Sequence, residues 1–555
     1  MEQFIEYFQR LSYQIEETTN QLDYGDEFPW SKLFNKPPFS LTYKKCQPLE
    51  TPEFEENKNK LENGIPLNPI DKINQYNRTD DYFIERFNIS YSKSNIVTCL
   101  GERPWFYYRN NLTTTIQNWL VLASGQAIYI YDLNTPYSNN STLPYVCGIN
   151  IILETASENA VNEAIMPNVR NTINYITYDE IEDVLLIADD FSRVVVIDVS
   201  KLKRAINGEK FEPLPNNIKV TLTTNDNEYK VSLGYYVITK SSTWGLKLYN
   251  KILYVSDNSH RITSYQFTKH GAHELNSSQD LLDNIPSIDV TSLNSSVIIA
   301  CTTIAGFIYI LDSNLNILDR LHTSDTQGWL CKFIPKDYFL TVTHPQYLTD
   351  DGHPPSFLKN IIAQSKSLND FHGLGIAANI QNLTVPTYEE CLTPPFSLAS
   401  NQTIQLNRHL QFIINKPNFN DYLFIATRTQ IGLFDPLLNN LASTPQLFPL
   451  NHRLSKLNLS CDLPKLNAIV VADSTGFVAL IRFTTYNGIK AYRVERFLLE
   501  TIKPFIIGLS STITGYDFEG NPEYAVIITH ATKDIDIFHI TNRSTHKNLD
   551  IYTII

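Results

Sequence analysis

The sequence predicts an all-β protein, a seven-bladed WD-type β-propeller with an N-terminal helix and long inter-blade insertions. The first observation is a repeat: an apolar run ends at a small residue, a polar turn follows, and an alternating strand comes next. The second is composition, since 31 Tyr and 29 Phe join abundant Ile, Val and Thr, which favour strands. The third is an apolar residue followed by Asp at the end of several units, where WD-type blades carry their dipeptide.

The repeat is clearest at Ser241–Phe267. Its apolar run, Leu246 to Val255, ends at Ser256, and a DNSH turn and an alternating strand follow. This pattern predicts two antiparallel strands joined by a tight turn, the inner pair of a blade. The other units are Asn118–Leu133, Ile173–Val199, Ile285–Asp312, Leu410–Pro436, Leu466–Phe483 and Tyr524–Ile540.

Small residues and Asp mark fixed positions in these units. A small side chain suits strands that crowd toward a central channel. The small residues are Ala123, Ala188, Ser256, Ala300, Ala426, Ala472 and Thr529, and the apolar–Asp pairs are Tyr131–Asp132, Ile197–Asp198, Leu311–Asp312 and Phe434–Asp435.

Seven units favour seven blades, with six or eight left open. The stretch GWLCKFIPKDYFLTVT, Gly328–Thr343, could belong to a further blade. The C-terminal NLDIYTII is a candidate for a strand that closes the ring.

The predicted organisation has three parts. Residues 1–25 form an amphipathic helix, residues 26–95 a Pro/Asn-rich arm or linker, and residues 96–555 the propeller, with an insertion at 345–407. The apolar face of the helix either packs against the propeller or lies in a partner's groove. The partner-binding candidates on that face are Phe4, Phe8, Leu11 and Ile15.

Charge and cysteine content limit the function classes. The chain has 45 Lys plus Arg against 58 Asp plus Glu, a net charge of −13, so we expect no direct nucleic-acid binding. The densest basic cluster, Lys201–Arg204, is interpreted as a solvated loop. Seven scattered cysteines favour reduced thiols, and neither a signal peptide nor a membrane span is indicated, so we expect a nuclear or cytoplasmic protein.

Motifs for covalent or metal chemistry are fragmentary, so we expect no catalytic, cofactor-binding or metal-ligating residues. The segment from Asp312 to Asn316 resembles the start of a calcium loop but is interpreted as a turn, and His270 and His273 as solvated. Asp189 and Asp190 are expected to cap a turn.

The alternative from another class is a propeller hydrolase or lactonase with a metal in the channel. It requires carboxylates or histidines where the inner strands begin. The strands expected to be innermost begin instead with apolar residues, which disfavours this alternative. These are Val121, Leu185, Leu253, Ile298, Phe424 and Val470.

Three stretches resemble a known family, the fungal Crt-type (member ten) regulators of ribonucleotide-reductase transcription. The resemblance covers about Ile173 to Tyr347. The first stretch is the WGL segment with the turn after it, the second is DNIPSIDV, and the third is QGWLCKFIP. The matching residues are Trp244, Gly245, Leu246, Ser256, Asn258, His260, Pro286 and Trp329.

The resemblance implies a WD-repeat-like, non-enzymatic scaffold in the nucleus or cytoplasm that binds protein partners. It further implies a link to negative control of ribonucleotide-reductase genes and a substrate-receptor role in a cullin ubiquitin ligase. The helix at 1–25 would then dock on the ligase adaptor. A second docking signature, Asp with Arg or Lys two residues later, is missing: Asp132, Asp198 and Asp312 are followed at that place by Asn134, Ser200 and Asn314.

Overall fold

In the computed structural model of the chain, almost every described element is a strand. The one α-helix among the described residues is α6 (Val199–Ile206), and two short 3-10 helices are η2 (Lys336–Tyr338) and η5 (Pro464–Leu466). The described residues are 87–96, 109–134, 141–151, 173–209, 211, 217–224, 227–268, 270–293, 296–323, 327–342, 419–428, 430–438, 440–444, 447, 456–486, 488–499, 506–517, 520–532 and 534–542.

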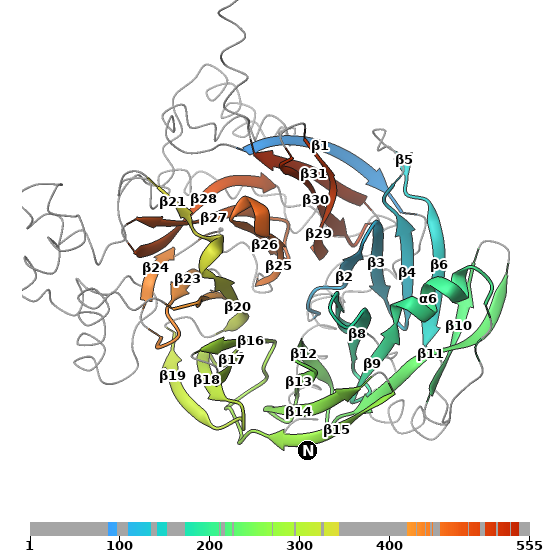
Figure 1. Cartoon of the computed structure of the whole chain (residues 1–555), viewed down its shortest axis with the longest axis horizontal. Coiled ribbons are helices and arrows are strands. Elements are labelled where there is room, and N and C mark those ends of the chain that lie inside the picture. The colour runs from blue at the N-terminus through green and yellow to red at the C-terminus, as the bar shows by residue number, and fades with distance from the viewer. Residues whose placement is uncertain are drawn as a thin grey trace, which may run out of the picture.

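The sheets stand around a central axis and form a ring (Figure 1). One nine-stranded sheet runs outward from the axis and back to it, in the order β2 (Thr113–Ile116), β3 (Trp119–Ser124), β4 (Ala127–Asp132), β6 (Tyr145–Ile151), β10 (Asn217–Thr223), β11 (Glu228–Ile238), β9 (Arg193–Asp198), β8 (Val184–Asp189), β7 (Ile173–Asp179). Because β10 pairs with both β6 and β11, it joins two four-stranded units at the rim.

Three four-stranded sheets follow along the chain. They are β12 (Thr243–Tyr249), β13 (Ile252–Asp257), β14 (Arg261–Thr268) and β15 (Gly271–Ser277); β16 (Ser287–Leu293), β17 (Ser296–Thr302), β18 (Phe307–Asp312) and β19 (Ile317–His322); and β20 (Gly328–Pro335), β22 (Asp421–Thr427), β23 (Ile431–Phe434) and β24 (Asn440–Thr444).

Two five-stranded sheets complete the ring. One holds β25 (Leu457–Leu463), β26 (Ala468–Asp473), β27 (Val478–Tyr486) and β28 (Ile489–Leu499), with β21 (Leu340–Thr341) parallel to β27. The other holds β29 (Ile506–Tyr516), β30 (Pro522–His530), β31 (Asp534–Asn542), β1 (Phe87–Asn95) and β5 (Ser141–Thr142). The innermost strands contact one another in a closed cycle, β2, β7, β12, β16, β20, β25, β29 and again β2.

The first described strand closes the ring by pairing with the last. β1 runs antiparallel to β31, from Phe87 opposite Asn542 to Asn95 opposite Asp534. Sequence analysis includes residues 87–95 in the arm, whereas this pairing puts them in a sheet of the ring. The C-terminal NLDIYTII, the sequence candidate for the closing strand, lies outside the described residues.

The repeated unit at Ser241–Phe267 contains three strands, not the two that its pattern predicts. The apolar run is divided between β12 and β13 by a tight turn at Asn250 and Lys251. Both turn residues have positive φ, 48° and 61°, the backbone of a two-residue hairpin turn. Because the strands on both sides of the turn are apolar, the pattern hides the break.

Two further expectations change in the structure. The Gly328–Thr343 stretch belongs to no additional blade, because its strand β20 is the inner strand of the sheet that contains β22 and β23. Lys201–Arg204 lie in α6 and not in a loop: Asp198 caps this helix through the Lys201 backbone N–H, and Leu202 is buried.

The Asp residues of the apolar–Asp pairs lie where the third strands end. Asp132, Asp198 and Asp312 are the last residues of β4, β9 and β18, and Asp435 directly follows β23. Each carboxylate accepts a backbone N–H from the turn that follows, which fixes the exit from the strand. The donors are Asn134, Lys201, Asn314 and Leu437.

The helix predicted at 1–25, the remainder of the arm before residue 87 and the 345–407 insertion lie outside the described residues. Within the described part of the chain, no helix is both long and apolar enough to cross a membrane.

We expect the closure of the ring to depend on a buried hydrogen bond from Tyr91. Its hydroxyl donates to the carboxylate of Asp536 at 2.7 Å, and Asp536 is 0% exposed. Tyr91→Phe leaves this carboxylate with one donor fewer and should lower the free energy of unfolding by about 1–3 kcal/mol. Urea unfolding measures the change.

The matched control is Tyr516→Phe at the exposed end of β29. Tyr516 is 68% exposed, so its hydroxyl can bond to water, and the expected change is below about 0.5 kcal/mol. Equal effects of the two substitutions would contradict the role assigned to Tyr91.

Candidate functional site

The innermost strands share an irregularity near their first residues. In five of the strands the register with the second strand shifts there, as at a β-bulge, and a bulge changes the direction of a side chain. The residues at these positions are Asn174 in β7, Trp244 and Gly245 in β12, Trp329 in β20, Asn458 in β25 and Ile507 in β29. The contacts below bring them together at one end of the axis.

Four residues that precede β2, Arg109–Leu112, connect the strands at this end, and we call them the axial segment. The backbone N–H of Asn110 donates to the Asn174 carbonyl at 2.9 Å, and its side-chain amide donates to the Pro286 carbonyl at 2.8 Å. The Arg109 carbonyl accepts from the Lys456 amine at 2.8 Å and from the Asn458 amide at 3.0 Å.

The second half of the axial segment binds β7 and β29. The Asn111 amide donates to the Leu509 carbonyl at 2.6 Å, and the Asn111 side-chain oxygen accepts from the Leu509 N–H at 3.0 Å. The Leu112 N–H donates to the Ile507 carbonyl at 3.0 Å, and the Ile176 N–H donates to the Asn111 carbonyl at 3.1 Å. The segment therefore binds strands on several sides of the axis.

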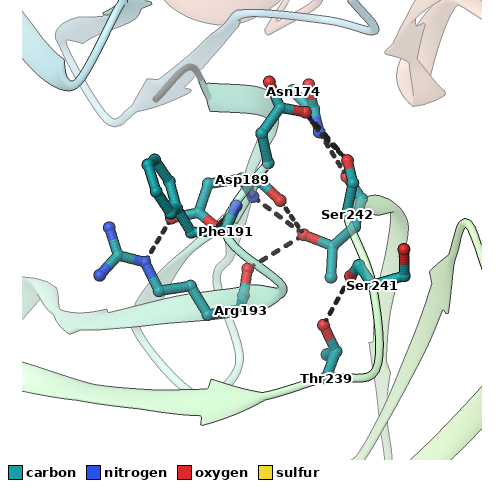
Figure 2. A network of polar contacts seen from close by, with 9 residues as sticks. Asn174, Asp189, Phe191, Arg193, Thr239, Ser241 and Ser242 are labelled. Carbon is teal, nitrogen blue, oxygen red and sulfur yellow. Dashed lines mark hydrogen bonds and ion pairs between the residues drawn. The ribbon is translucent and has the colours of Figure 1, made fainter. Parts of the chain in front are cut away.

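A polar network joins the axial segment to the sheets of β7 and β12, and Figure 2 shows the part of it around Asn174 and Ser242. Arg109 forms an ion pair with Asp190 at 2.8 Å. The Asn174 amide donates to Asp190 at 2.9 Å, to the Ser242 hydroxyl at 3.1 Å and to the Thr243 carbonyl at 2.8 Å. The Ser242 hydroxyl also donates to Asp190 at 2.9 Å. Asp190 therefore contacts three chain segments: Arg109 of the axial segment, Asn174 of β7 and Ser242 just before β12.

Asp189 caps the neighbouring turn, as the sequence predicts. Its carboxylate accepts the Phe191 backbone N–H at 2.9 Å and pairs with the Arg193 guanidinium (Figure 2). The Thr243 hydroxyl accepts the Asp189 N–H at 2.9 Å, which ties this turn to the next sheet. Asp189 is 1% exposed, and burial raises its pKa to about 6 against the opposing effect of Arg193.

Lys456 is a buried lysine at the same end of the axis. It is 2% exposed, its amine lies 4.4 Å from the centroid of the Trp329 ring, and it donates to the Arg109 carbonyl. Burial, with the Arg109 charge second, lowers the pKa of Lys456 well below its ordinary value. Trp329, one of the family-motif residues, therefore has a contact partner at the axis.

Further along the axis, two ion pairs join neighbouring inner strands. The Lys247 amine of β12 lies 2.7 Å from Asp289 of β16, and the Lys332 amine of β20 lies 2.8 Å from Asp462 of β25. Asp289 also accepts the Phe333 N–H of β20 at 2.7 Å, so its carboxylate contacts three inner strands.

These pairs shift the titration of both lysines upward. Asp289 raises the pKa of Lys247 above its usual value against the effect of burial. For Lys332, burial lowers the pKa, but Asp462 and then Asp289 outweigh it and hold the pKa above the usual range. Both amines therefore stay protonated and paired at neutral pH.

This arrangement corrects the expectation that the innermost strands are apolar. Val121, Leu185, Leu253, Ile298, Phe424 and Val470 lie in β3, β8, β13, β17, β22 and β26, which are the second strands from the axis. The apolar pattern marks the second strands more strongly because innermost strands such as β12 and β16 are mixed in polarity. Their single Lys or Asp residues carry no spacing signal.

The motif residues that carry the family resemblance lie at and near the junction of the β12 and β16 sheets. The Ser256 hydroxyl accepts the Gly245 N–H at 2.8 Å and donates to the Ile285 carbonyl at 2.7 Å. Pro286 follows and offers its carbonyl to Asn110. The small residue of this unit thus links its own inner strand to the next sheet.

Two other motif residues, Asn258 and His260, lie in the turn after β13, whereas Leu246 faces the sheet on the other side of β12. Asn258 donates its N–H to the Ser242 carbonyl at 2.9 Å, and His260, with φ of 61°, accepts the Leu281 N–H at its carbonyl. Leu246 is buried in the core between the sheets of β9 and β13. By contrast, the partner-binding candidates Phe4, Phe8, Leu11 and Ile15 lie outside the described residues.

Four residues with several contacts at the axis are not predicted from the sequence: Arg109, Asn110, Lys456 and Asp289. Asn110 and Asn111 form an Asn pair just before an apolar-polar strand, which is the one local signal that could have suggested a tie between segments. No group of three His, Cys, Asp or Glu that could hold a metal exists among the described residues.

The ring of sheets and its polar axis define a β-propeller whose axial charges are used to join its own strands. The chain belongs to the CRT10 family, whose model matches residues 79–325 and 411–555. It is also similar to Protein CRT10 of Saccharomyces cerevisiae, at 30% identity over 91 residues. That match spans 14% of this chain and 10% of the yeast protein's length.

Several solved structures are also similar to this chain. The Saccharomyces cerevisiae Sqt1 structure has a TM-score of 0.41 at 7% identity, covering 78% of this chain and 96% of that one. The structure of the RRP9 WD40 repeats has a TM-score of 0.42 at 8% identity, covering 82% and 98%.

We expect Gly245 to tolerate no side chain. A Cβ there would lie 2.8 Å from the Ser256 hydroxyl oxygen and 3.2 Å from Ile288. Gly245→Ala should therefore lower the free energy of unfolding by about 1–3 kcal/mol, measured by urea unfolding. Gly271→Ala is the control, since a Cβ there meets nothing within 4 Å. A loss of stability at Gly271 as large as at Gly245 would contradict the packing argument.

Asp189 should make stability depend on pH in an unusual direction. Its pKa is about 6 in the folded chain and about 3.9 when unfolded. Between these values the folded state holds a proton that the unfolded state has released, so the contribution of Asp189 falls as pH rises from about 4 to 6. The stability of the native chain relative to Asp189→Asn should fall by up to roughly 3 kcal/mol across this window.

Asp312→Asn supplies a control of opposite sign for the same urea titrations. Despite burial, hydrogen bonds from the Asn316 side chain and backbone hold the pKa of Asp312 below its ordinary value. The native chain should therefore gain stability relative to this variant as pH rises through the acid range. A constant difference between the native chain and Asp189→Asn would show that Arg193 cancels the effect of burial, and a difference that grows with pH would show that Arg193 outweighs it.

Proposed function

We propose that this chain is a non-enzymatic scaffold, a seven-bladed propeller that holds protein partners and regulates ribonucleotide-reductase transcription. Membership of the CRT10 family supports this class of function. We place its action in the nucleus or cytoplasm, in line with its scattered cysteines.

The observation that supports the proposal is that charged side chains at the axis pair with one another. Lys247, Asp289, Lys332 and Asp462 pair across neighbouring inner strands. In each pair the lysine neutralises the carboxylate. This supports a structural role for these side chains, whereas a propeller enzyme would direct its axial charged groups at a substrate. Protein partners would then be recognised by the outer surfaces of the ring.

The cycle of inner strands supports a count of seven blades. Each of β2, β7, β12, β16, β20, β25 and β29 begins a series of four strands directed outward, with β11 and β1 as the outer strands of two series. The bridge through β10 merges two of these series into one sheet, which is why fewer sheets than blades result.

We further propose that partners bind the end of the ring opposite the axial segment. Exposed apolar side chains lie there: Ile513 and Tyr516 on the far part of β29, 37% and 68% exposed, and Ile181 after β7, 92% exposed. The described strand that follows the 345–407 insertion also begins at this end, because Asp421, the first residue of β22, pairs with Pro335 at the far end of β20. Insertions and loops often carry binding residues.

A finer proposal is that the chain is a substrate receptor of a cullin ubiquitin ligase, docked through residues 1–25. The apolar stripe of Phe4, Phe8, Leu11 and Ile15 supports it. The alternative, a channel-metal hydrolase or lactonase, is disfavoured by the lysine partners of Asp289 and Asp462. Metal analysis of the purified protein would separate the two classes.

The test is affinity purification with mass spectrometry on the full chain and three variants. The variants are a deletion of residues 1–25, a deletion of residues 345–407, and the double substitution Ile513→Ser with Tyr516→Ser. We expect the last two to reduce partner recovery at least tenfold, and the first to remove a cullin adaptor.

Ile238→Ser is the matched control, since Ile238 is 75% exposed but lies at the opposite end of the ring, where the last residue of β11 pairs with Arg193. It should leave recovery unchanged. Partner recovery that survives both the 345–407 deletion and the double substitution would refute the proposed face. A cullin adaptor absent from the full chain as well would refute the ligase role alone.

A further inference from the structure

The axial segment differs from the other inter-sheet contacts because it reaches strands that are not neighbours. In a ring of repeated sheets each unit normally contacts only the units beside it, so cooperativity passes from neighbour to neighbour. Arg109–Leu112 instead contact β7, the Pro286 carbonyl before β16, and strands β25 and β29. In the cycle of inner strands, β12 separates β7 from β16, and β20 separates β16 from β25.

These contacts are buried and directed. Asn110 is 6% exposed and Asn174 is 0% exposed, so their polar groups cannot exchange a lost partner for bulk water. The Asn110 amide donates to a backbone carbonyl, which can only accept, and this fixes the orientation of the side chain. Opening any one of the contacted sheets therefore breaks hydrogen bonds to the axial segment. Because the same segment also binds the other contacted sheets, their support is weakened too.

We propose that the axial segment makes the ring one cooperative unit, by coupling the sheets of β7, β16, β25 and β29 directly. The same part of the chain also closes the rim, since β1 pairs with β31 shortly before the axial segment. β1 and the axial segment thus supply an outer and an inner closure, respectively. Displacement of this N-terminal part would loosen distant sheets together, which gives the fold a built-in conformational control.

The experiment uses the full chain and the double variant Asn110→Ala with Asn111→Ala. Urea unfolding is followed by circular dichroism and by tryptophan fluorescence, and hydrogen exchange is read by mass spectrometry at low urea. In the native chain we expect coincident transitions. In the variant we expect separated transitions, with exchange at least tenfold faster in β7, β25 and β29 and smaller changes in β13 and β14.

Tyr235→Phe is the matched control. The Tyr235 hydroxyl donates to the Thr268 carbonyl at 2.7 Å, so it joins two neighbouring sheets at the rim. This substitution should lower stability but keep the transitions coincident. If the double variant also unfolds in one coincident transition with uniform changes in exchange, the proposed coupling is wrong.

A measurement on the native chain keeps the proposal testable if the double variant fails to fold. The backbone amides of Leu112, Ile176 and Leu509 each donate a hydrogen bond that joins the axial segment to β7 or β29. If the segment couples the sheets, these amides exchange only through global unfolding and share one urea dependence. Exchange at lower urea than the core strands β8 and β26 would overturn the proposal.

Discussion

The inner strands of every sheet meet around one axis, and the rest of the structure follows from the crowding there. Strands that converge leave little room for side chains on the neighbouring positions, so Gly245 lies against Ser256 and Ile288, and a Cβ at Gly508 would overlap Thr113. Polar groups in this space lie close to those of neighbouring strands, and many of them pair with one another. The axis therefore selects glycines, small hydroxyl residues and paired charges.

Two sets of polar contacts provide this pairing. At one end the axial segment binds inner strands through backbone carbonyls and asparagine amides. Further along, Lys247 with Asp289 and Lys332 with Asp462 join adjacent strands. The side chains of both pairs are partly exposed, and such pairs add little net stability, but they favour the strand arrangement in which opposite charges are neighbours. The axis thus fixes the ring geometry that the outer surfaces depend on.

The family motif gains a physical explanation in this setting. The Ser256 hydroxyl bonds both to Gly245 and to the Ile285 carbonyl, so it joins one inner strand to the next sheet. Pro286 then gives its carbonyl to Asn110 of the axial segment. Trp329 faces the Lys456 amine. Residues far apart in the sequence belong to one continuous set of contacts, which is a structural role and requires no ligand.

The sequence by itself determined the strand-rich architecture, the position of the small residues and the turn-capping role of Asp189, because each depends on neighbours within a few positions. It did not separate β12 from β13, since apolar residues flank a two-residue turn. Only the tertiary structure decided that β1 closes the ring with β31 and that Lys247, Asp289, Lys332 and Asp462 meet at the axis. Those contacts join residues with no fixed spacing, and the physical reason for each partner exists only once the ring has closed.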